Sequence, residues 1–528
     1  MNKALFFLAI LFTCASFGQI TLEHTYDNGV VTRVKLEYSG EKYYLFKRAT
    51  NELVFYNADH SLWKTIVLPA PAPNEILPPT HLFHVSEAKI NPDANLEIIY
   101  GAYNTASQQY ESRIISENGI ILLTIPNAYQ VDLNEIPGLP NKIIVKNFTT
   151  SISRVYSVPE LVLENTYTGG DVNRIKLENS GEKYYLLDKV NNNIKVYNQN
   201  HSLWKTINLT KPANATYSDL GIISESQINP DALLEIGYTY YTSNGSSFNY
   251  VGKLISENNV DLLTIPQAET MYVSVLEGCE NKLIAKINYS NSSYGNIIYS
   301  SNVYKLPSLL LENAYDGEIT RIKLENSGEK YYTSNQPLNN QAKIYNNDHT
   351  LWKIIGLPVP YEGYSVASVN HISESKINPD TLLELSYTYY SPMIMEPYYW
   401  SSVISENGTV LVTGGGGGFY LSEIQGLNNK LIGNGKVYSL ETMKTTDFVS
   451  HSKVSVAPNP ASSLLNINSK SSPIIEAAIY NTIGALVKQD HSLNITKMDV
   501  ENLPSGIYVL RLKDVNNQKS THKITISH

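Results

Sequence analysis

The chain has 528 residues and a net charge of -9, with 42% hydrophobic and 17% charged residues. This composition excludes a disordered acidic chain, and the negative charge argues against nucleic acid as the main partner. Tyrosine is in excess, with 39 Tyr beside 11 Phe and 4 Trp. Because tyrosine favours half-buried sheet positions, we expect an all-β protein. With only two cysteines, the chain has neither a disulfide scaffold nor a cysteine-based metal site.

The first 18 residues are predicted to be a secretory signal peptide. Lys3 precedes a continuous apolar run from Ala4 to Ser16, and small residues precede a cleavage site at Gln19. The alternative is a buried strand or a membrane anchor, but a run of about 13 apolar residues is shorter than the ~20 that span a bilayer. Lipidation of Cys14 is not expected, because Thr13 precedes it. We therefore expect export across the inner membrane.

Residues 19–441 are predicted to form one repeat domain. Arg174–Tyr185 recurs letter for letter at Arg321–Tyr332, and with two changes at Arg33–Tyr44. Alternating apolar and polar residues around an Asn-Ser-Gly turn predict β-hairpins. The three copies span about 22–160, 161–308 and 309–441, and Trp63, Trp204 and Trp352 mark the same position in each.

A shorter echo recurs about every ~45 residues, the size of a four-stranded propeller blade. Its nine markers are Tyr56, Ile115, Tyr156, Tyr197, Ile255, Tyr299, Tyr345, Ile404 and Tyr438. The array resembles diverged β-propellers, with seven to nine blades or six larger ones. Leu22–Tyr26 matches a strand that elsewhere follows each copy, and no such strand follows Lys436–Leu440. We expect these two segments to pair and close the ring, which removes both sheet edges.

The tail from Val454 to His528 follows a polar segment, 442–453, that is the expected linker. Short alternating strands between Pro, Gly and Asn turns predict a small β-sandwich. Its ordered motifs are Ala457-Pro-Asn-Pro460, Ile479–Val487, Leu503–Leu512 and Lys523–Ile526, with Pro458, Asn459, Pro460, Gly484, Gly506, Tyr508 and Lys523 as the motif residues. The set resembles the type A C-terminal sorting domain of the type IX (Por) secretion system of Bacteroidota. That resemblance implies contact with the type IX machinery, passage through the outer membrane, and surface anchoring or release.

Side chains capable of catalysis recur in all three copies, which a single catalytic centre does not need. We expect turn and strand-edge roles for the glutamates, with a shared ligand face as the alternative, and a hydrogen bond between blades for the histidines. These residues are Glu97, Glu235 and Glu384; Glu117, Glu257 and Glu406; and His60, His201 and His349. No common catalytic motif is matched, so no catalytic residue and no cofactor is assigned, and the protein is predicted not to be an enzyme.

Three Asn-Pro-Asp triplets resemble fragments of calcium-binding loops. They begin at Asn91, Asn229 and Asn378. Asn-Pro-Asp is also a common turn, and no D-x-D-x-D-G run accompanies it. The sequence alone therefore favours turns, and no metal ligand is assigned.

Function is expected where the copies disagree. The loops Pro69–His84, Thr210–Gly221 and Pro358–His371 differ in every copy, and the third copy adds the candidate ligand-binding residues Tyr398, Tyr399, Trp400, Phe419 and Tyr420. Exposed aromatic rings stack on sugars or anchor protein partners. Glycines 414–418 are expected to be a flexible connection. The sequence thus predicts a surface or secreted protein that binds a glycan or a protein. The alternatives are a secreted polysaccharide-degrading enzyme and a structural component of the surface layer or gliding machinery.

Overall fold

The computed structural model describes residues 20–528 apart from 28–29, 70–72, 78–81, 148, 246, 292–295, 335–338, 361–362, 379, 381, 392–398, 416, 441–453, 470–471, 482–484 and 516–518. The predicted signal peptide lies outside these residues. The chain divides into two compact units, Met1–Glu441 and Thr442–His528. All 44 elements of the described part are strands, so the all-β prediction is confirmed. A helix of the length and hydropathy needed to cross a bilayer is absent from that part.

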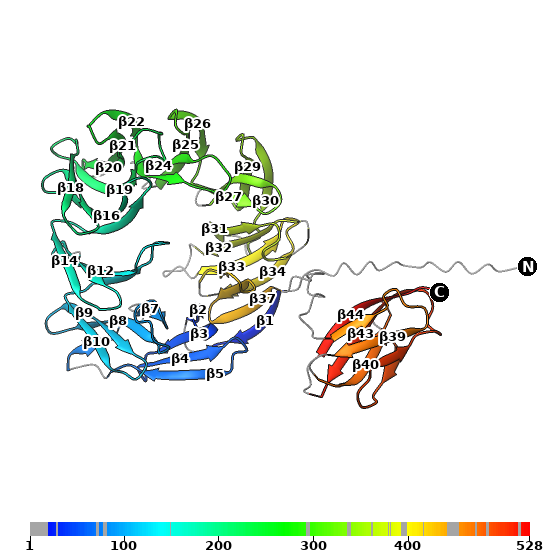
Figure 1. The fold of residues 1–528 in the computed structure, drawn as a ribbon. Coiled ribbons are helices and arrows are strands. Elements are labelled where there is room, and N and C mark those ends of the chain that lie inside the picture. Colours follow the sequence, from blue (N-terminus) through cyan, green and yellow to red (C-terminus); the bar gives the residue numbers. More distant parts are fainter. Residues whose placement is uncertain are drawn as a thin grey trace, which may run out of the picture. The chain divides into compact units, whose positions relative to one another are not determined.

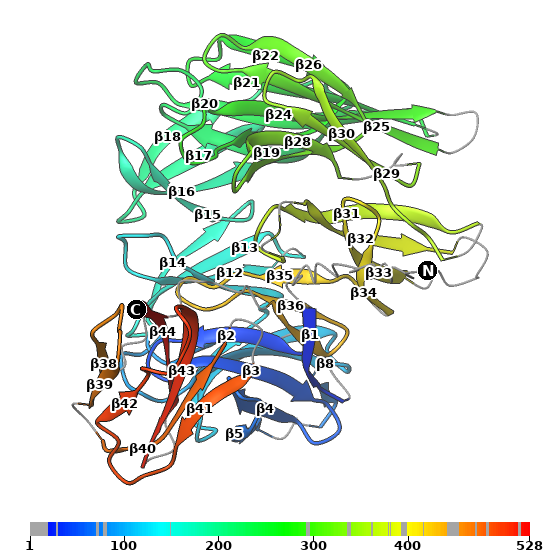
Figure 2. The same cartoon turned by 90° about the vertical axis from the view of Figure 1, so that its right-hand side faces the viewer.

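The first unit contains nine antiparallel sheets in its described residues, and we call them blades 1 to 9 (Figures 1 and 2). Nine is the upper end of the predicted range. Every predicted marker residue lies in the third strand of its blade, if the first strand of blade 2, which is divided into two segments that pair with the same neighbour, is counted once. The marker pattern belongs to one repeated hairpin.

The strands are, for blade 1, β2 (Thr32–Leu36), β3 (Gly40–Lys47), β4 (Glu52–Asn57) and β5 (Leu62–Val67); for blade 2, β6 (Glu75–Ile76), β7 (Leu82–Ser86), β8 (Glu97–Asn104), β9 (Gln109–Ser116) and β10 (Ile121–Pro126); and for blade 3, β11 (Gln130–Asn134), β12 (Lys142–Asn147), β13 (Ile152–Ser157) and β14 (Leu163–Thr168). Blade 4 has β15 (Asn173–Leu177), β16 (Gly181–Asp188), β17 (Asn193–Asn198) and β18 (Leu203–Asn208); blade 5 has β19 (Thr216–Ser224), β20 (Glu235–Ser243), β21 (Phe248–Ser256) and β22 (Asp261–Pro266); and blade 6 has β23 (Ala268–Ser274), β24 (Lys282–Asn291), β25 (Asn296–Lys305) and β26 (Leu310–Asp316). Blade 7 has β27 (Ile319–Leu324), β28 (Gly328–Thr333), β29 (Gln341–Asn346) and β30 (Leu351–Gly356); blade 8 has β31 (Ser365–Ser373), β32 (Glu384–Tyr390), β33 (Tyr399–Ser405) and β34 (Val410–Gly415); and blade 9 has β35 (Tyr420–Ser422), β36 (Lys430–Gly433), β37 (Lys436–Leu440) and β1 (Ile20–Thr25).

Blade 9 is assembled from both ends of the unit, as the sequence predicts. β1 pairs antiparallel with β37, with Ile20 opposite Leu440 and Thr25 opposite Lys436. Tyr26 follows β1 and is buried between blades 9 and 1. The ring is therefore closed by hydrogen bonds between the first and the last described strands of the unit.

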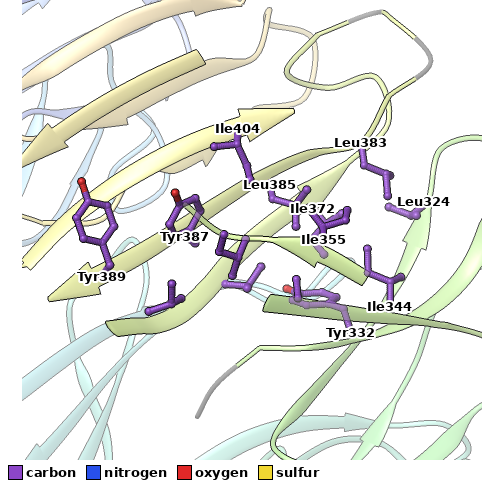
Figure 3. Packing of buried hydrophobic residues seen from close by; sticks show 14 residues of the cluster. Leu324, Tyr332, Ile344, Ile355, Ile372, Leu383, Leu385, Tyr387, Tyr389 and Ile404 are labelled. Atoms are coloured by element: carbon purple, nitrogen blue, oxygen red, sulfur yellow. The ribbon is translucent and has the colours of Figure 1, made fainter. Parts of the chain in front are cut away.

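Alternation along each strand places apolar side chains between neighbouring blades. Blades 7 and 8 share one such cluster, in which β28 and β29 supply Tyr332 and Ile344 and β32 supplies Leu385 and Tyr387 (Figure 3). The turn between β15 and β16 requires a backbone φ of +71° at Gly181, and glycine occupies the same turn in blades 1 and 7. The repeated letters therefore encode hairpins whose faces pack on the next blade.

A buried arginine joins every third blade to the blade before it. Arg174 of blade 4 donates from Nε to Glu182 at 2.7 Å, and both side chains are almost fully buried. Its Nη atoms donate to the carbonyl oxygens of Asn134, the last residue of the first strand of blade 3, and of Pro140, which follows that strand. Arg33 and Arg321 make the equivalent contacts in blades 1 and 7. We call these three residues the arginine latches.

The repeated histidines also join blades, as predicted. His60 Nδ1 lies 2.8 Å from the hydroxyl of Tyr26, and the same bond pairs His201 with Tyr167 and His349 with Tyr315. Burial lowers the pKa of all three histidines. Their role is to fix the outer strand of one blade against a turn of the next.

The second unit has two sheets, one of β38 (Val454–Ala457), β39 (Leu464–Ser469) and β42 (Lys497–Asp499), the other of β41 (Leu486–Asp490), β40 (Ile474–Tyr480), β43 (Gly506–Asp514) and β44 (Lys519–Ile526). Asn459 of the Pro458-Asn-Pro460 motif donates to the carbonyl of Lys523 and accepts from the amide of Thr525. Tyr508 donates to the carbonyl of Pro504, and Gly506 pairs with Ile526. The motif residues therefore fasten the last strand, while Gly484 lies outside the described residues.

Candidate ligand-binding face

The two ends of each blade carry different connections. Since the four strands of a blade are antiparallel, the hairpin between the second and third strands opens at the same end as the connection to the next blade. We call this end the hairpin face. The three variable loops belong to it, because they connect blades 1 and 2, 4 and 5, and 7 and 8. Their last residues form the first strand of the following blade, so only their first halves are loops.

Tyrosine pairs lie in the last part of the paired strands of three hairpins on this face. Tyr390 of β32 is opposite Tyr399 of β33, and their ring centroids are 5.8 Å apart. The pair recurs at the equivalent positions of blades 2 and 5, as Tyr103 with Tyr110 at 4.7 Å and Tyr241 with Tyr250 at 5.6 Å. Tyr399 is therefore a repeated residue, although the sequence places it where the copies disagree. The repeat can be recognised in the sequence from the tyrosine that pairs with it, because that tyrosine lies six residues after the repeated glutamate in every copy.

Further aromatic rings extend two of these pairs. Tyr129, which is 43% exposed, packs edge-on against Tyr110 at 4.7 Å. Phe248, which is 48% exposed, packs against Tyr241 at 5.2 Å. Tyr399 itself is 44% exposed. Each pair thus presents ring surface to solvent on a paired hairpin, which is the arrangement that stacking on a ligand needs.

Trp400 does not share a surface with Tyr399, because successive residues of a strand point to opposite faces of the sheet. Trp400 is stacked on Tyr389 with ring centroids 6.1 Å apart, and Tyr364 packs on it at 5.3 Å. It is half-buried against the core shared by blades 7 and 8. Tyr398 lies outside the described residues. The predicted aromatic run therefore divides into one exposed tyrosine and one packed tryptophan.

Phe419 and Tyr420 also separate. Phe419 is only 3% exposed and packs edge-on against Tyr438 at 5.8 Å, so its ring belongs to the core between blades 8 and 9. Tyr420 is 46% exposed and begins β35, the first strand of blade 9. Gly414 lies in β34 and not in a flexible connection. Glycine is needed at Gly414 and Gly433 to leave room for the Phe419 ring. A Cβ atom at these positions would lie 2.9 Å and 2.6 Å from that ring.

Replacing Gly433 by alanine should destabilise the protein by about 1–3 kcal/mol, the usual cost of overpacking a core. The added Cβ would meet Phe419 at 2.6 Å, and the carbonyl oxygen of Gly418 at 3.2 Å prevents a simple shift. Urea unfolding measures the change. The matched control is Gly356→Ala at the end of β30, where no atom lies within 4 Å of the new Cβ. Equal stability of the two variants would contradict the packing role of Phe419.

The repeated glutamates behave in two ways. Glu117 accepts from Lys64 of blade 1 at 2.6 Å and from the backbone amide of Leu96 at 3.0 Å. Glu257 and Glu406 make the same contacts, so the predicted turn role is confirmed for this set. Glu97 begins β8 and is fully buried, but neither of its carboxylate oxygens makes a hydrogen bond of good geometry. Glu235 and Glu384 repeat this arrangement.

Comparison with known proteins identifies the tail. A family model described as the secretion system C-terminal sorting domain matches residues 455–527. The second unit is therefore a type IX sorting domain, and the protein is exported by that system to the cell surface or the medium. No curated protein matches the chain.

Solved structures similar to this chain include three with low sequence identity. BamB from Moraxella catarrhalis is 9% identical with a TM-score of 0.36, over 69% of this chain and 98% of that one. The Dos1 propeller is 11% identical with a TM-score of 0.35, over 80% and 95%. The biofilm matrix protein Bap1 of V. cholerae is 10% identical with a TM-score of 0.28, over 68% and 73%. The propeller assignment of this chain itself stands on its nine blades.

Proposed function

We propose that the exported propeller is a non-enzymatic binding protein whose hairpin face holds an extended polysaccharide. One observation carries the proposal: paired tyrosine rings recur on the second hairpin in blades 2, 5 and 8. Aromatic rings offer a flat apolar face to the C–H side of a sugar ring, while the hydroxyl remains available for hydrogen bonds.

The threefold recurrence favours a repeating ligand over a compact one. Each pair lies three blades from the next, so the same contact surface is offered three times around the ring. A polymer with a repeating unit can occupy several such surfaces at once, and the second contact then forms at a high effective concentration. A single small ligand would engage one pair only. Modest affinity at each pair therefore suffices for tight retention of a polymer.

The variable loops can supply the selectivity that the tyrosine pairs lack. The connection between blades 4 and 5 contains Lys211, whose Nζ lies 5.2 Å above the ring of Tyr217 and donates to the carbonyl of Ala215. The other two connections have neither residue at the matching positions. The connection between blades 4 and 5 therefore differs in its polar residues from the other two.

Replacing one tyrosine of each pair should weaken binding far more than replacing one alone. Tyr103→Ala, Tyr241→Ala or Tyr390→Ala singly should lower affinity about 2- to 10-fold, which corresponds to ~0.5–1.5 kcal/mol for an aromatic contact. The triple variant should lose more than 100-fold in avidity for a polymer. Immobilised-polysaccharide binding, on ligands first selected with a glycan array and the full chain, measures both.

Tyr38→Ala is the matched control, because Tyr38 is 62% exposed but lies in the turn between β2 and β3, at the opposite end of its blade. It should bind as the unaltered protein does. Loss of binding in this control, or retention in the triple variant, would refute the tyrosine pairs as the contact surface. A protein ligand captured by the same face, with no glycan bound, would contradict the polysaccharide assignment.

The enzyme alternative makes a different prediction. Catalytic acids at a single centre would differ from their counterparts in the other copies, whereas the glutamates at 97, 235 and 384 share one environment. We therefore expect the full chain to release no reducing ends from a polysaccharide that it binds. Release that survives repeated purification would favour the enzyme instead.

A further inference from the structure

Three rows of buried oxygen atoms lie at the end of blades 2, 5 and 8 opposite the hairpin face. Glu97, the first residue of β8, pairs in register with Ser86 of β7 on one side and Ser116 of β9 on the other. Directly opposite residues in an antiparallel sheet project their side chains on the same face. The three side chains therefore stand side by side, and we call each such set a carboxylate row. The other two rows are Ser224, Glu235 and Ser256, and Ser373, Glu384 and Ser405.

These rows lack the hydrogen bonds that their burial requires. Glu97 is 0% exposed, and neither its two carboxylate oxygens nor the buried hydroxyls of Ser86 and Ser116 make a hydrogen bond of good geometry. The backbone amide of Asn91 lies close enough to lower the pKa of Glu97, but it does not offset the burial of the carboxylate. The equivalent atoms make no such hydrogen bond in the third row, and in the second row Ser224 Oγ alone accepts bonds, from two backbone amides. A buried carboxylate without a well-formed hydrogen bond is costly, and the arrangement occurs at the same repeat position in all three copies.

The nearest charged groups are also negative, so they increase the free-energy cost of ionising the buried glutamate. The Asn91-Pro-Asp93 turn lies between β7 and β8, and Asp93 is the charged group that acts most strongly on Glu97. Burial, with Asp93, Glu117 and Glu37 adding to it, raises the pKa of Glu97 to about 8, against the opposing effect of the backbone amide of Asn91. Burial raises the pKa of Glu235 to about 8 and that of Glu384 to about 9, with Asp231 and Asp380 in the place of Asp93.

Lysine does not neutralise these groups. Lys89 forms ion pairs with Glu37 and Glu135. In the second copy the corresponding residue is Gln227, yet Glu235 is buried without a well-formed hydrogen bond in the same way. The three rows share the same set of oxygen atoms that can bind a cation. These belong to one buried carboxylate, two serine hydroxyls and the carboxylate of the Asn-Pro-Asp turn.

We propose that each carboxylate row binds one calcium ion, held between the row and the Asn-Pro-Asp turn beside it. Two carboxylates balance the charge of a divalent cation, and hydroxyl oxygens satisfy a hard ion that accepts six to eight oxygen ligands. Clusters of three or more acidic, histidine or cysteine side chains able to hold a metal do not occur in the described ranges. The neutral oxygens are therefore essential, and we expect affinities of extracellular calcium modules, about 0.1–1 mM.

Calcium at these positions would fasten the loop between the first and second strands to the end of its own blade. Asp93 already orders this turn, since it accepts from the side chain of Asn91 and the amide of Asn95. The ion would add a link from the turn to three strands at once. The rows lie away from the tyrosine pairs, so this inference is independent of the proposed ligand.

The test uses the full chain without its leader, stripped with EDTA and titrated with calcium chloride. We expect about three calcium ions per chain by isothermal titration and by elemental analysis after equilibrium dialysis, and a rise in melting temperature with calcium. Each of Glu97→Gln, Glu235→Gln and Glu384→Gln should lower the stoichiometry by one, because glutamine keeps the size of the side chain and removes its charge. The triple variant should bind none.

Other outcomes overturn the proposal. If the rows hold only water and neutral carboxyl groups, the full chain will bind no calcium at millimolar concentration, and the glutamine variants will be as stable as the parent in EDTA and in calcium. Calcium binding that persists unchanged in the single variants would place the ions elsewhere. Magnesium binding of equal affinity would contradict the calcium assignment. Glu111→Gln, on the same blade but outside the row, is the control and should leave the stoichiometry at three.

Discussion

Deleting Ile20–Tyr26 will open the propeller and destabilise the whole first unit by at least about 3 kcal/mol. The lower bound is the usual loss on truncating one buried aromatic side chain, here Tyr26, which is 6% exposed. The deletion also removes every hydrogen bond between β1 and β37 and the Tyr26–His60 bond. It leaves β37 as an unpaired edge, which invites association between molecules. Thermal unfolding and size-exclusion chromatography measure both effects.

A peptide of residues 20–27 added in excess should restore the monomer and much of the lost stability, because β1 binds without a covalent link to β37. Leu22→Lys is the control, since Leu22 is 49% exposed and its substitution should change stability by less than about 0.5 kcal/mol. A deletion variant that melts like the full chain and remains monomeric would show that β1 does not close the ring.

Arg174→Ala should destabilise the protein by about 3–5 kcal/mol, the cost of removing one partner from a buried ion pair. The arginine side chain is 0% exposed and that of Glu182 is 2% exposed. Without the guanidinium, Glu182 keeps only the hydroxyl of Tyr184, and the carbonyls of Asn134 and Pro140 lose their donor. Urea unfolding of the variant, compared with the parent, gives the difference.

The neighbouring position provides the control for this latch. Lys176 lies two residues further along β15 and is exposed, with only a 3.5 Å contact to the carbonyl of Pro137. Lys176→Ala should therefore cost less than about 0.5 kcal/mol. The double variant Arg174→Met with Glu182→Leu should be more stable than Arg174→Ala, because no buried charge is left alone. If Arg174→Ala and Lys176→Ala have the same free energy of unfolding, the buried arginine does not stabilise the contact between blades.

The repeats made most of this fold predictable. Segments of identical sequence adopt the same structure. The hairpins, the blade spacing and the histidine hydrogen bonds could therefore be predicted from repeated residues such as His60 and Trp63 without any contact being known. The closing strand was predictable for a related reason. A strand present after two copies and missing after the third indicates that its counterpart lies elsewhere in the chain.

The sites were less predictable, because they depend on register between strands. Ser86 and Ser116 are separated from Glu97 by 11 and 19 positions, and only the pairing of three strands brings them into one row. For Phe419 the sequence prediction of a ligand-binding role was wrong. Its place beside a glycine run suggested exposure, but the glycines leave room for its ring to enter the core. Adjacency along the chain also suggested that Tyr399 and Trp400 act together, whereas strand geometry separates them.

The position of β37 within blade 9 determines how the first unit resists force applied to the chain that follows it. The chain leaves the ring at Leu440, so tension on the second unit reaches the first through β37. β37 has β36 on one side and β1 on the other, and peeling it away requires two ladders of hydrogen bonds to break together. As an edge strand it would open one ladder, bond by bond. β1 therefore protects the end of the ring from which the chain continues to the second unit against peeling.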